Sequence, residues 1–322
     1  MIVPRDVLSF LQKEGAFLIL GHAEPDADCL GSQIALAQLI QQLGGKTILC
    51  SPGPFLRSEI RSWEPLFQVR PREFFQSFDF VVVLDCSVAE RTGDWQSVIL
   101  GKPTLVIDHH SSGTPFGNLI YLDTTSPSTS LLVYRIYQAS GIPIDPVAAF
   151  ALMMGSCTDT GFFRHLGPYQ SETLLMSAQL SQLGVDLREV YRLMNSGQSP
   201  ENLRLLGSLL ERMELHLDGK VVVASEKEGE RSELGATSRP TDQLYQLIFS
   251  IDCVELIIVL RPENGFTIGG LRSREFVDCG KLAFRYGGGG HQRASGFRTM
   301  RELDVVKQEL LVLASQIIPK NS

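Results

Sequence analysis

The chain has 322 residues, of which 43% are hydrophobic and 20% are charged, and its formal net charge is −7. This composition is typical of a globular protein, and the length fits two domains, since a domain usually contains ~100 to 200 residues. The negative charge argues against a protein that coats long duplex nucleic acid, because such proteins gain affinity from many Lys and Arg contacts with phosphates.

Cysteine usage and hydropathy indicate the compartment. The six cysteines form no C-x-x-C pair and are too sparse for a disulfide framework in a chain of this length. No stretch approaches the ~18 apolar residues of a membrane span, and the N-terminus lacks the pattern of a signal peptide. We therefore expect a cytoplasmic protein with no membrane partner.

The first half of the chain has the pattern of an α/β fold. Short, nearly continuous apolar runs are typical of parallel strands that are buried on both faces, and four occur here, at 17–20, 46–50, 78–84 and 103–107. Apolar residues at helical spacing lie between the first two runs, and further helices are predicted at 129–139, 146–156 and 170–182. The expected architecture is a doubly wound, mainly parallel sheet.

The second half predicts a smaller domain. Residues 192–203 are polar and rich in turn formers, and an amphipathic helix follows. Beyond it, strands are predicted at 220–225, 255–262 and 266–273, with helices at 241–250 and 302–317. We therefore expect a first domain over 1–191, a linker and connecting helix over 192–215, and a mixed-sheet α/β domain over 216–322.

Asp and His residues follow the predicted strands. His22, Asp26 and Asp28 come after the first strand, Asp85 ends the third, and the Asp108–His110 triplet follows the fourth. Asp159 follows an apolar, helix-like run. Ligands of open α/β sheets bind beyond the carboxyl ends of the strands, so these side chains should meet at one rim.

A single Asp at a strand end usually caps the following helix or fixes a turn. Several such acids at one rim would create a strong negative potential unless cations compensate it. Carboxylate oxygens with a few imidazoles suit hard divalent ions, so we expect two of them, Mn²⁺ first and Mg²⁺ as the alternative. A two-metal centre needs a shared ligand, and Asp85 has the central position for it.

Several neighbours of these motifs allow two interpretations. Gly31 and Ser32 are expected to open a helix, whose N-terminus either binds phosphate or simply starts the helix. The Ser and Thr residues at 125–129 are interpreted as a loop and helix cap, with phosphate contact as the alternative. The thiols beside the motifs are interpreted as small fillers of strand ends, with a redox or metal role as the alternative; they are Cys29, Cys86 and Cys157.

A second constellation lies near the C-terminus. Four successive glycines, 287–290, allow backbone amides to approach an anion closely, although a flexible linker has the same composition. Arg272 is suited to a bidentate phosphate contact and His291 to donating a hydrogen bond. Arg164 is a further candidate, for which a solvated loop is the competing interpretation.

These motifs resemble those of the DHH phosphoesterases. HAEPDAD, VVVLDCS, VIDHHSS, GSCTDTGFF and GGGGHQRASGF match the family's motifs in order, although Ala27 stands where many relatives have Gly. Within this family, the length of the chain and its pair of domains are most similar to those of the stand-alone oligoribonuclease and pAp phosphatase branch. RecJ-type exonucleases carry an added oligonucleotide-binding domain, and family II pyrophosphatases end in a basic motif that we do not find.

The resemblance implies a role for each site residue. One metal would be held by His22, Asp26 and Asp85, and the other by Asp28, Asp85, His109 and Asp159. Asp108 would orient a ligand histidine, as metal-bound imidazoles usually require, and His110 would meet the scissile phosphate or the leaving oxygen. Substrate would be bound across an interdomain cleft by Arg164, Arg272, Ser273, Gly288, Gly289, Gly290 and His291.

The expected activity is hydrolysis of short oligoribonucleotides to mononucleotides and removal of the 3'-phosphate of pAp, an adenosine with 3'- and 5'-phosphates. One alternative is a phosphodiesterase acting on cyclic di-AMP or a linear dinucleotide. Another is a non-catalytic nucleotide sensor. A homodimer is compatible with the sequence, which does not decide the oligomeric state.

Overall fold

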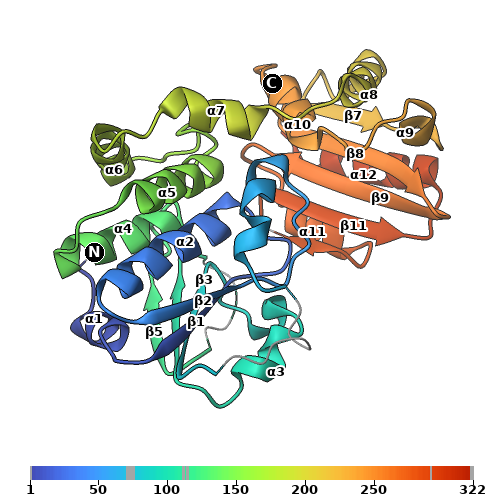
Figure 1. The fold of residues 1–322 in the computed structure, drawn as a ribbon. Coiled ribbons are helices and arrows are strands. Elements are labelled where there is room, and N and C mark those ends of the chain that lie inside the picture. The colour runs from blue at the N-terminus through green and yellow to red at the C-terminus, as the bar shows by residue number, and fades with distance from the viewer. Residues whose placement is uncertain (1, 70–76, 111–112, 114–115, 291, 320–322) are drawn as a thin grey trace. The chain divides into compact units, whose positions relative to one another are not determined.

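The computed structural model describes residues 2–69, 77–110, 113, 116–290 and 292–319. The chain divides into two compact units, Met1–Gly197 and Gln198–Ser322, and each is considered by itself (Figure 1). Among the described helices, none combines the length and apolar character needed to cross a membrane.

The described part of the first unit contains a five-stranded parallel sheet in the order β2-β1-β3-β4-β5. The doubly wound fold and its four predicted strands are confirmed. The fifth strand was missed, because it has only four residues and follows a polar stretch. The strands are β1 (Ala16–Leu20), β2 (Lys46–Cys50), β3 (Phe80–Leu84), β4 (Thr104–Asp108) and β5 (Leu119–Leu122).

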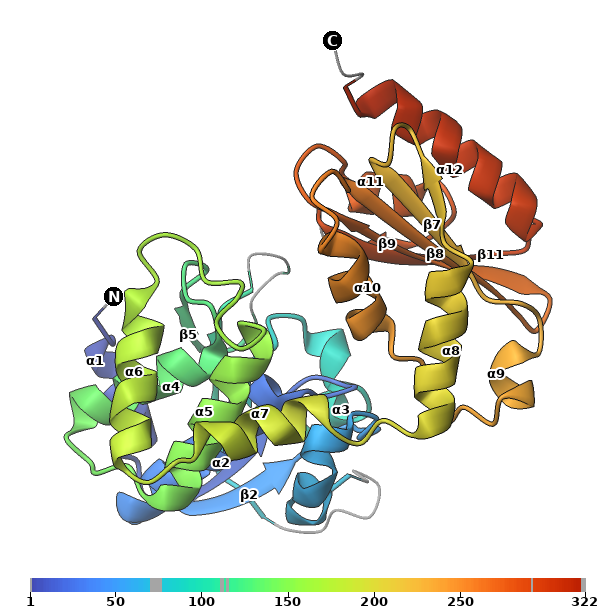
Figure 2. The same ribbon diagram turned by 90° about the horizontal axis from the view of Figure 1, so that it is seen from above.

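Alternate side chains of these strands enter two different cores, which explains their continuous apolar sequence. Phe17 and Ile19 of β1 face the core shared with α2, α4 and α5, whereas Leu18 and Leu20 face the core that contains Trp95 of α3. Figures 1 and 2 show α2, α4 and α5 beside one another. The helices are α1 (Arg5–Leu11), α2 (Ala27–Gln42), η1 (Ser58–Leu66), η3 (Ala89–Thr92), α3 (Trp95–Ile99), α4 (Thr129–Ser140), α5 (Pro146–Asp159), α6 (Ser171–Gln182) and α7 (Leu187–Asn195).

The start of α2 corrects the prediction that Gly31 and Ser32 open this helix. The helix begins at Ala27, because Asp26 is its N-cap and its carboxylate accepts hydrogen bonds from the backbone N–H of Asp28 and Cys29. Gly31 instead lies inside the helix, where α2 crosses α5. The correction matters for the site, since it places Asp28 in the first turn of α2.

The second unit is built on a mixed sheet in the order β10-β11-β9-β8-β7-β6, in which only the β7–β8 pair of the described strands is parallel. Its two faces are covered by α11 and α12 and by α8 and α10. The elements are α8 (Pro200–Glu211), β6 (Glu214–His216), β7 (Val221–Ser225), α9 (Glu230–Glu233), α10 (Thr241–Phe249), β8 (Leu256–Glu263), β9 (Phe266–Ser273), α11 (Cys279–Phe284), β10 (Gly289–Gly290), β11 (Ala294–Thr299) and α12 (Leu303–Ile317).

The helix that we expected to connect the two domains is instead part of the second unit. It is α8, and Leu205, Leu206 and Leu209 pack it into the core of the second unit. Its exposed face explains the amphipathic pattern, and a helix that buries leucines on a sheet belongs to that sheet's unit. Residues 192–195, also assigned to the linker, form the end of α7.

Two helical glycines provide a matched test of the packing. A Cβ at Gly31 would lie 2.4 Å from the carbonyl oxygen of Ala151 in α5, whereas a Cβ at Gly207 in α8 would meet no atom within 4 Å. Gly31→Ala should lower the free energy of unfolding by about 1 to 3 kcal/mol. Gly207→Ala should raise it by about 0.5 to 1 kcal/mol. Denaturant titration measures both, and equal effects would contradict the close α2–α5 crossing.

Candidate metal centre

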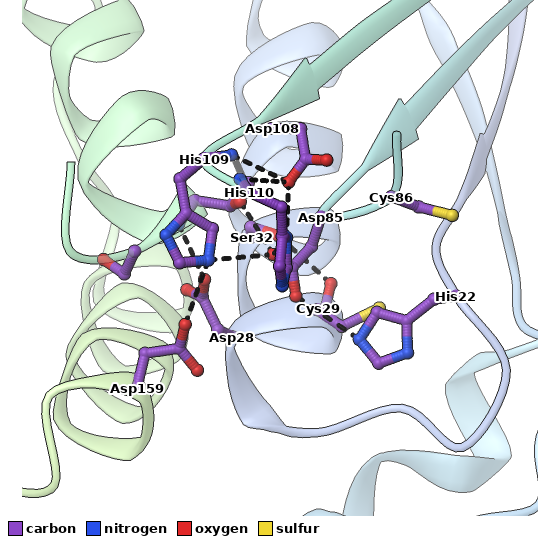
Figure 3. A network of polar contacts seen from close by, with 12 residues as sticks. His22, Asp28, Cys29, Ser32, Asp85, Cys86, Asp108, His109, His110 and Asp159 are labelled. Atoms are coloured by element: carbon purple, nitrogen blue, oxygen red, sulfur yellow. Dashed lines mark hydrogen bonds and ion pairs between the residues drawn. The ribbon is translucent and has the colours of Figure 1, made fainter. Parts of the chain in front are cut away.

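The site lies where the strand order of the first sheet reverses. Connections leave the neighbouring strands β1 and β3 toward opposite edges of the sheet, which opens a crevice at their carboxyl ends. His22 follows β1, Asp85 follows β3 directly, and Asp108 ends β4. Figure 3 shows the side chains of these residues gathered at this rim.

Asp85 is at the centre of the group. Its side chain is 2% exposed, and its oxygens lie 3.4 Å from His22 Nε2, 3.4 Å from His109 Nε2 and 3.5 Å from His110 Nδ1. The Thr129 hydroxyl donates a hydrogen bond of 3.0 Å to Oδ1. The backbone of Asp85 has a φ of +57°, a left-handed conformation that costs a non-glycine residue about 1 to 2 kcal/mol. Such strain often marks a functional position.

Asp28 is oriented by the N-terminus of α4. The backbone N–H groups of Thr129 and Ser130 donate to its two carboxylate oxygens at 2.6 and 2.9 Å. Because a helix N-terminus carries partial positive charge, it stabilises a carboxylate there. Ser128 caps α4 through its hydroxyl, so the helix-cap interpretation of the 125–129 segment is confirmed at this residue.

Asp159 is the last residue of α5, as the prediction that it approaches from a helix end required. Its Oδ2 lies 3.1 Å from His109 Nε2. Gly155, one turn earlier, permits this approach, because a Cβ there would lie 2.1 Å from Ser130 Oγ and 2.9 Å from the Asp28 backbone. Ligand atoms of Asp28, His109 and Asp159 thus lie within 4.8 Å of one another.

The two histidines of the triplet have different orienting partners. Asp108 Oδ1 accepts hydrogen bonds from the backbone N–H of His109 and His110 and lies 2.8 Å from His110 Nδ1. The ring of His109 is oriented instead by the carbonyl oxygen of Ser126, 3.1 Å from Nδ1. The residue that we expected to orient a ligand histidine therefore contacts the histidine assigned to the substrate. Sequence reasoning missed the Ser126 carbonyl, because any residue type can supply one.

The residues of the first motif, HAEPDAD, have two different roles, since one caps a helix and others belong to the site. Asp26 is half-buried and caps α2 through Oδ1, and it belongs to none of the ligand-atom groups found among the described residues. His22 and Asp85 instead form such a group with the thiol of Cys29. Sequence reasoning had interpreted Cys29 as a filler, and only the folded first turn of α2 reveals its neighbours.

Burial and mutual contacts shift the pKa values of the buried carboxylates in opposite directions. Burial and the charges of Asp159 and Asp85 raise the pKa of Asp28, and burial raises the pKa of Asp159 to about 6. Burial disfavours ionised Asp85, but its contacts with His109 and His22 outweigh burial and hold its pKa well below the usual range. Three carboxylates therefore share one small buried region, and the ion pairs that the described residues form there with Asp85 and Asp159 come from imidazoles.

This arrangement fits divalent cations. Atoms bound at roughly 2.0 to 2.2 Å to one cation lie roughly 3.0 to 3.4 Å apart, and the separations of His109 Nε2 from Asp159 and Asp85 are 3.1 and 3.4 Å. His109 Nε2 is buried and has no hydrogen-bond partner among the described residues. A buried nitrogen that faces two carboxylates at this spacing has the geometry of a ligand.

The predicted substrate residues of the second unit lie in different settings, and their contact with substrate stays a prediction. The Arg272 guanidinium stacks on Tyr245, with its carbon 4.6 Å from the ring centroid, and no carboxylate pairs with it among the described residues. Ser273 is the last residue of β9 and is buried, and its hydroxyl donates to the Val277 carbonyl at 2.6 Å, so its side chain holds the segment that follows the strand. His291 lies outside the described residues. Arg164, in the first unit, is exposed and donates to the Gly161 carbonyl.

The glycine run is not a flexible linker. Gly289 and Gly290 form β10 and pair with Gly296 and Ser295 of β11. A Cβ at Gly288 would lie 2.2 Å from the carbonyl oxygen of Gly296, so close backbone packing already requires glycine there. The Gly288 N–H donates to the Ala283 carbonyl. An anion-binding role for these amides stays a prediction.

The Thr129 hydroxyl provides a test of the site's electrostatics without a metal. Thr129→Val keeps the shape and the N–H bond to Asp28 but removes the donor to buried Asp85, which should lower the free energy of unfolding by about 1 to 3 kcal/mol in chelator. Thr47→Val on β2, which loses only an exposed bond to Gln41, is the control and should change it by less than about 0.5 kcal/mol. Equal effects would show that the Asp85 contact contributes nothing.

The chain is similar to known proteins in sequence. Residues 16–156 match the model of the DHH family, N-terminal domain. The chain is 27% identical over 300 residues to the bifunctional oligoribonuclease and PAP phosphatase NrnA of Thermus thermophilus, covering 91% of this chain and 86% of that protein. It is 28% identical over 282 residues to the Bacillus subtilis protein of the same name, covering 85% and 86%.

The fold has a close counterpart among solved structures. An exopolyphosphatase-related protein from Bacteroides fragilis superimposes with a TM-score of 0.85 at 23% identity, over 97% of this chain and 96% of that one. A likeness at this identity supports the fold of each unit. The family match and the strand-end motifs lead to one assignment: residues 16–156 of this chain belong to the DHH family as its N-terminal domain.

Proposed function

We propose that the protein is a metal-dependent phosphoesterase that hydrolyses short oligoribonucleotides to mononucleotides and removes the 3'-phosphate of pAp. The observation that carries the proposal is the buried group of carboxylates and imidazoles around Asp85. The similarity over most of the chain to proteins named oligoribonuclease and PAP phosphatase supports this substrate class.

We assign one cation to Asp28, Asp85, His109 and Asp159 and the other to His22, Asp26 and Asp85. Because oxygen ligands predominate, Mn²⁺ is the proposed ion and Mg²⁺ the alternative. When bound, the two cations would activate water and stabilise the negative charge that develops on the phosphoryl oxygens. Asp26 is the least supported ligand, since its Oδ1 already caps α2.

The chain's own residues would position the reacting phosphate. His110 is the most accessible imidazole of the group, with 27% of its side chain exposed, and its Nδ1 faces Asp108. Its Nε2 is therefore the nitrogen directed away from that carboxylate, and we assign it the proton donated to the leaving oxygen. Asp108 would orient this ring and stabilise its protonated form.

Arg272 is the proposed contact for a second phosphate or nucleotide of the substrate. Its guanidinium is stacked on Tyr245, and Nη1 donates to the Leu271 carbonyl at 3.0 Å. No carboxylate among the residues described competes for the remaining donors, which we assign to an anion.

Replacing Asp85 by Asn tests the metal centre. Asn keeps the side-chain volume and tolerates the left-handed backbone, but it removes the shared negative charge. We expect kcat/KM with Mn²⁺ to fall on the order of 10³-fold or more, with an unchanged circular dichroism spectrum. The thermal stabilisation that Mn²⁺ gives the unsubstituted protein should also disappear.

Asp145→Asn is the matched control, because Asp145 caps α5 away from the site and Asn caps equally well. Its activity and its response to Mn²⁺ should equal those of the unsubstituted protein. Substantial hydrolysis by Asp85→Asn would contradict the assignment of Asp85 as the shared ligand.

Replacing Arg272 by Gln tests the substrate contact. The KM for a dinucleotide should rise roughly 10- to 100-fold, since a charge-assisted bond contributes about 1.5 to 3 kcal/mol, while hydrolysis of bis(p-nitrophenyl) phosphate should stay unchanged. Arg298→Gln is the control, because Arg298 also stacks on an aromatic ring, that of Phe266, in the same sheet. An equal KM for both variants would remove Arg272 from the binding site.

A substrate panel distinguishes the proposed function from its rivals. Purified protein is incubated with Mn²⁺ or chelator and with pAp, short RNA, cyclic di-AMP, its linear product or pyrophosphate, and the products are separated by chromatography. Preferred Mn²⁺-dependent turnover of short RNA and pAp supports the proposal. Preference for cyclic di-AMP or its linear product would replace it by the alternative phosphodiesterase, and binding without turnover would indicate a nucleotide sensor.

A further inference from the structure

The side chain of Cys29 lies in the candidate metal centre. It is fully buried in the first turn of α2, and its Sγ lies within 4.8 Å of ligand atoms of both His22 and Asp85. Figure 3 shows Cys29 between Asp85 and His22. An imidazole, a thiol and a carboxylate that come from three different segments of the chain thus converge on one point.

The surroundings orient this thiol. The buried amide of Gln33, one turn along α2, donates from Nε2 to Cys29 Sγ at 3.5 Å and to the Cys29 carbonyl at 3.1 Å. On another side, a Cβ at residue 21 would lie 2.2 Å from Sγ, so the glycine there provides the space that the thiol occupies. The Gln33 amide and the space beside the glycine therefore fix the position of the sulfur next to His22 and Asp85.

Burial alone does not explain these features. Cys86 is equally buried and lies directly after Asp85, but its Sγ donates to the Val88 carbonyl at 3.2 Å and joins no ligand-atom group among the described residues. Figure 3 shows its thiol directed away from the group around Asp85. Cys86 therefore has the filler role that we predicted for both cysteines, whereas Cys29 does not.

We propose that Cys29 Sγ is a ligand of the cation held by His22 and Asp85, and that this half of the centre prefers thiophilic ions such as Zn²⁺ or Co²⁺. The proposal rests on the proposed function, since it requires a metal centre at Asp85. Thiolate and imidazole select such ions over Mg²⁺ and Mn²⁺, whereas the carboxylate-rich group of Asp28, His109 and Asp159 suits the harder ions. Binding would break the S–H bond, form a sulfur–metal bond and release one proton to the solvent.

The two halves of the centre would therefore differ in metal preference. An asymmetric pair of sites would bind one ion of each kind when both are supplied. It would also reduce the importance of Asp26 as a ligand, because the sulfur would occupy a coordination position that the helix cap leaves open.

Cobalt spectroscopy of the full chain tests the proposal without an activity measurement. The chelator-treated protein is titrated with Co²⁺, and sulfur coordination should produce an intense near-ultraviolet charge-transfer band in addition to the visible bands of Co²⁺. The band should be absent from Cys29→Ser and Cys29→Ala, and present at full intensity in Cys86→Ser and in Cys253→Ser, which replaces the exposed thiol. Calorimetry should show Zn²⁺ affinity reduced at least about tenfold in Cys29→Ala, with Mn²⁺ affinity unchanged.

Three results would overturn the proposal, the first two by excluding the thiol and the third by excluding the metal centre. Visible Co²⁺ bands without a charge-transfer band in the unsubstituted protein, or a band that survives Cys29→Ala and Cys29→Ser, would exclude the thiol as a ligand and leave the metal centre intact. Absence of both Co²⁺ bands and of heat with Mn²⁺ would overturn the metal centre itself. A Co²⁺ spectrum of the unsubstituted protein that lacks the charge-transfer band would exclude sulfur coordination even where a variant fails to fold.

Discussion

The Asp85 carboxylate is the interaction on which the rest of the site depends. It is a buried negative charge at the reversal of the strand order, and three imidazoles from two different loops face it. A buried charge is costly unless partners compensate it, so the surrounding elements have to converge on this point. The left-handed backbone of Asp85 directs the carboxylate to that position, and the strain is tolerated because the hydrogen bond of its N–H to Ile107 holds the strand end.

Helix N-termini hold two further carboxylates of the site in place. Asp26 caps α2 with its side chain, and α4 directs two backbone N–H groups at Asp28. The positive end of a helix holds a carboxylate in place without a competing cationic side chain, which would otherwise repel a divalent ion. Close crossing of α2 and α5 at Gly31 and Gly155 then brings Asp159 to the same point. The site is thus a product of helix packing as much as of the strand ends.

Particular residues show which parts of this site the sequence predicts. Asp85, Asp108 and His22 were predicted to meet because each follows an apolar strand, and parallel strands end at one edge. Asp159 was predicted from the turn after an apolar helix. The start of α2, the orientation of His109 by a carbonyl and the strand formed by the glycine run were not predicted, because a cap, a carbonyl partner and a strand pairing each depend on which distant segment comes close.

The sequence by itself determined the fold class, the strand ends and the chemical kinds of side chain at the rim, since apolar periodicity and residue type are local properties. Only the tertiary structure decided which histidine each carboxylate faces, that Ser273 and Gly288 have structural roles, and that Cys29 but not Cys86 joins the group around Asp85. Those distinctions are distances of a few ångströms between residues far apart in the chain. They follow from how α2, α4 and α5 pack on the sheet, which residue type alone does not encode.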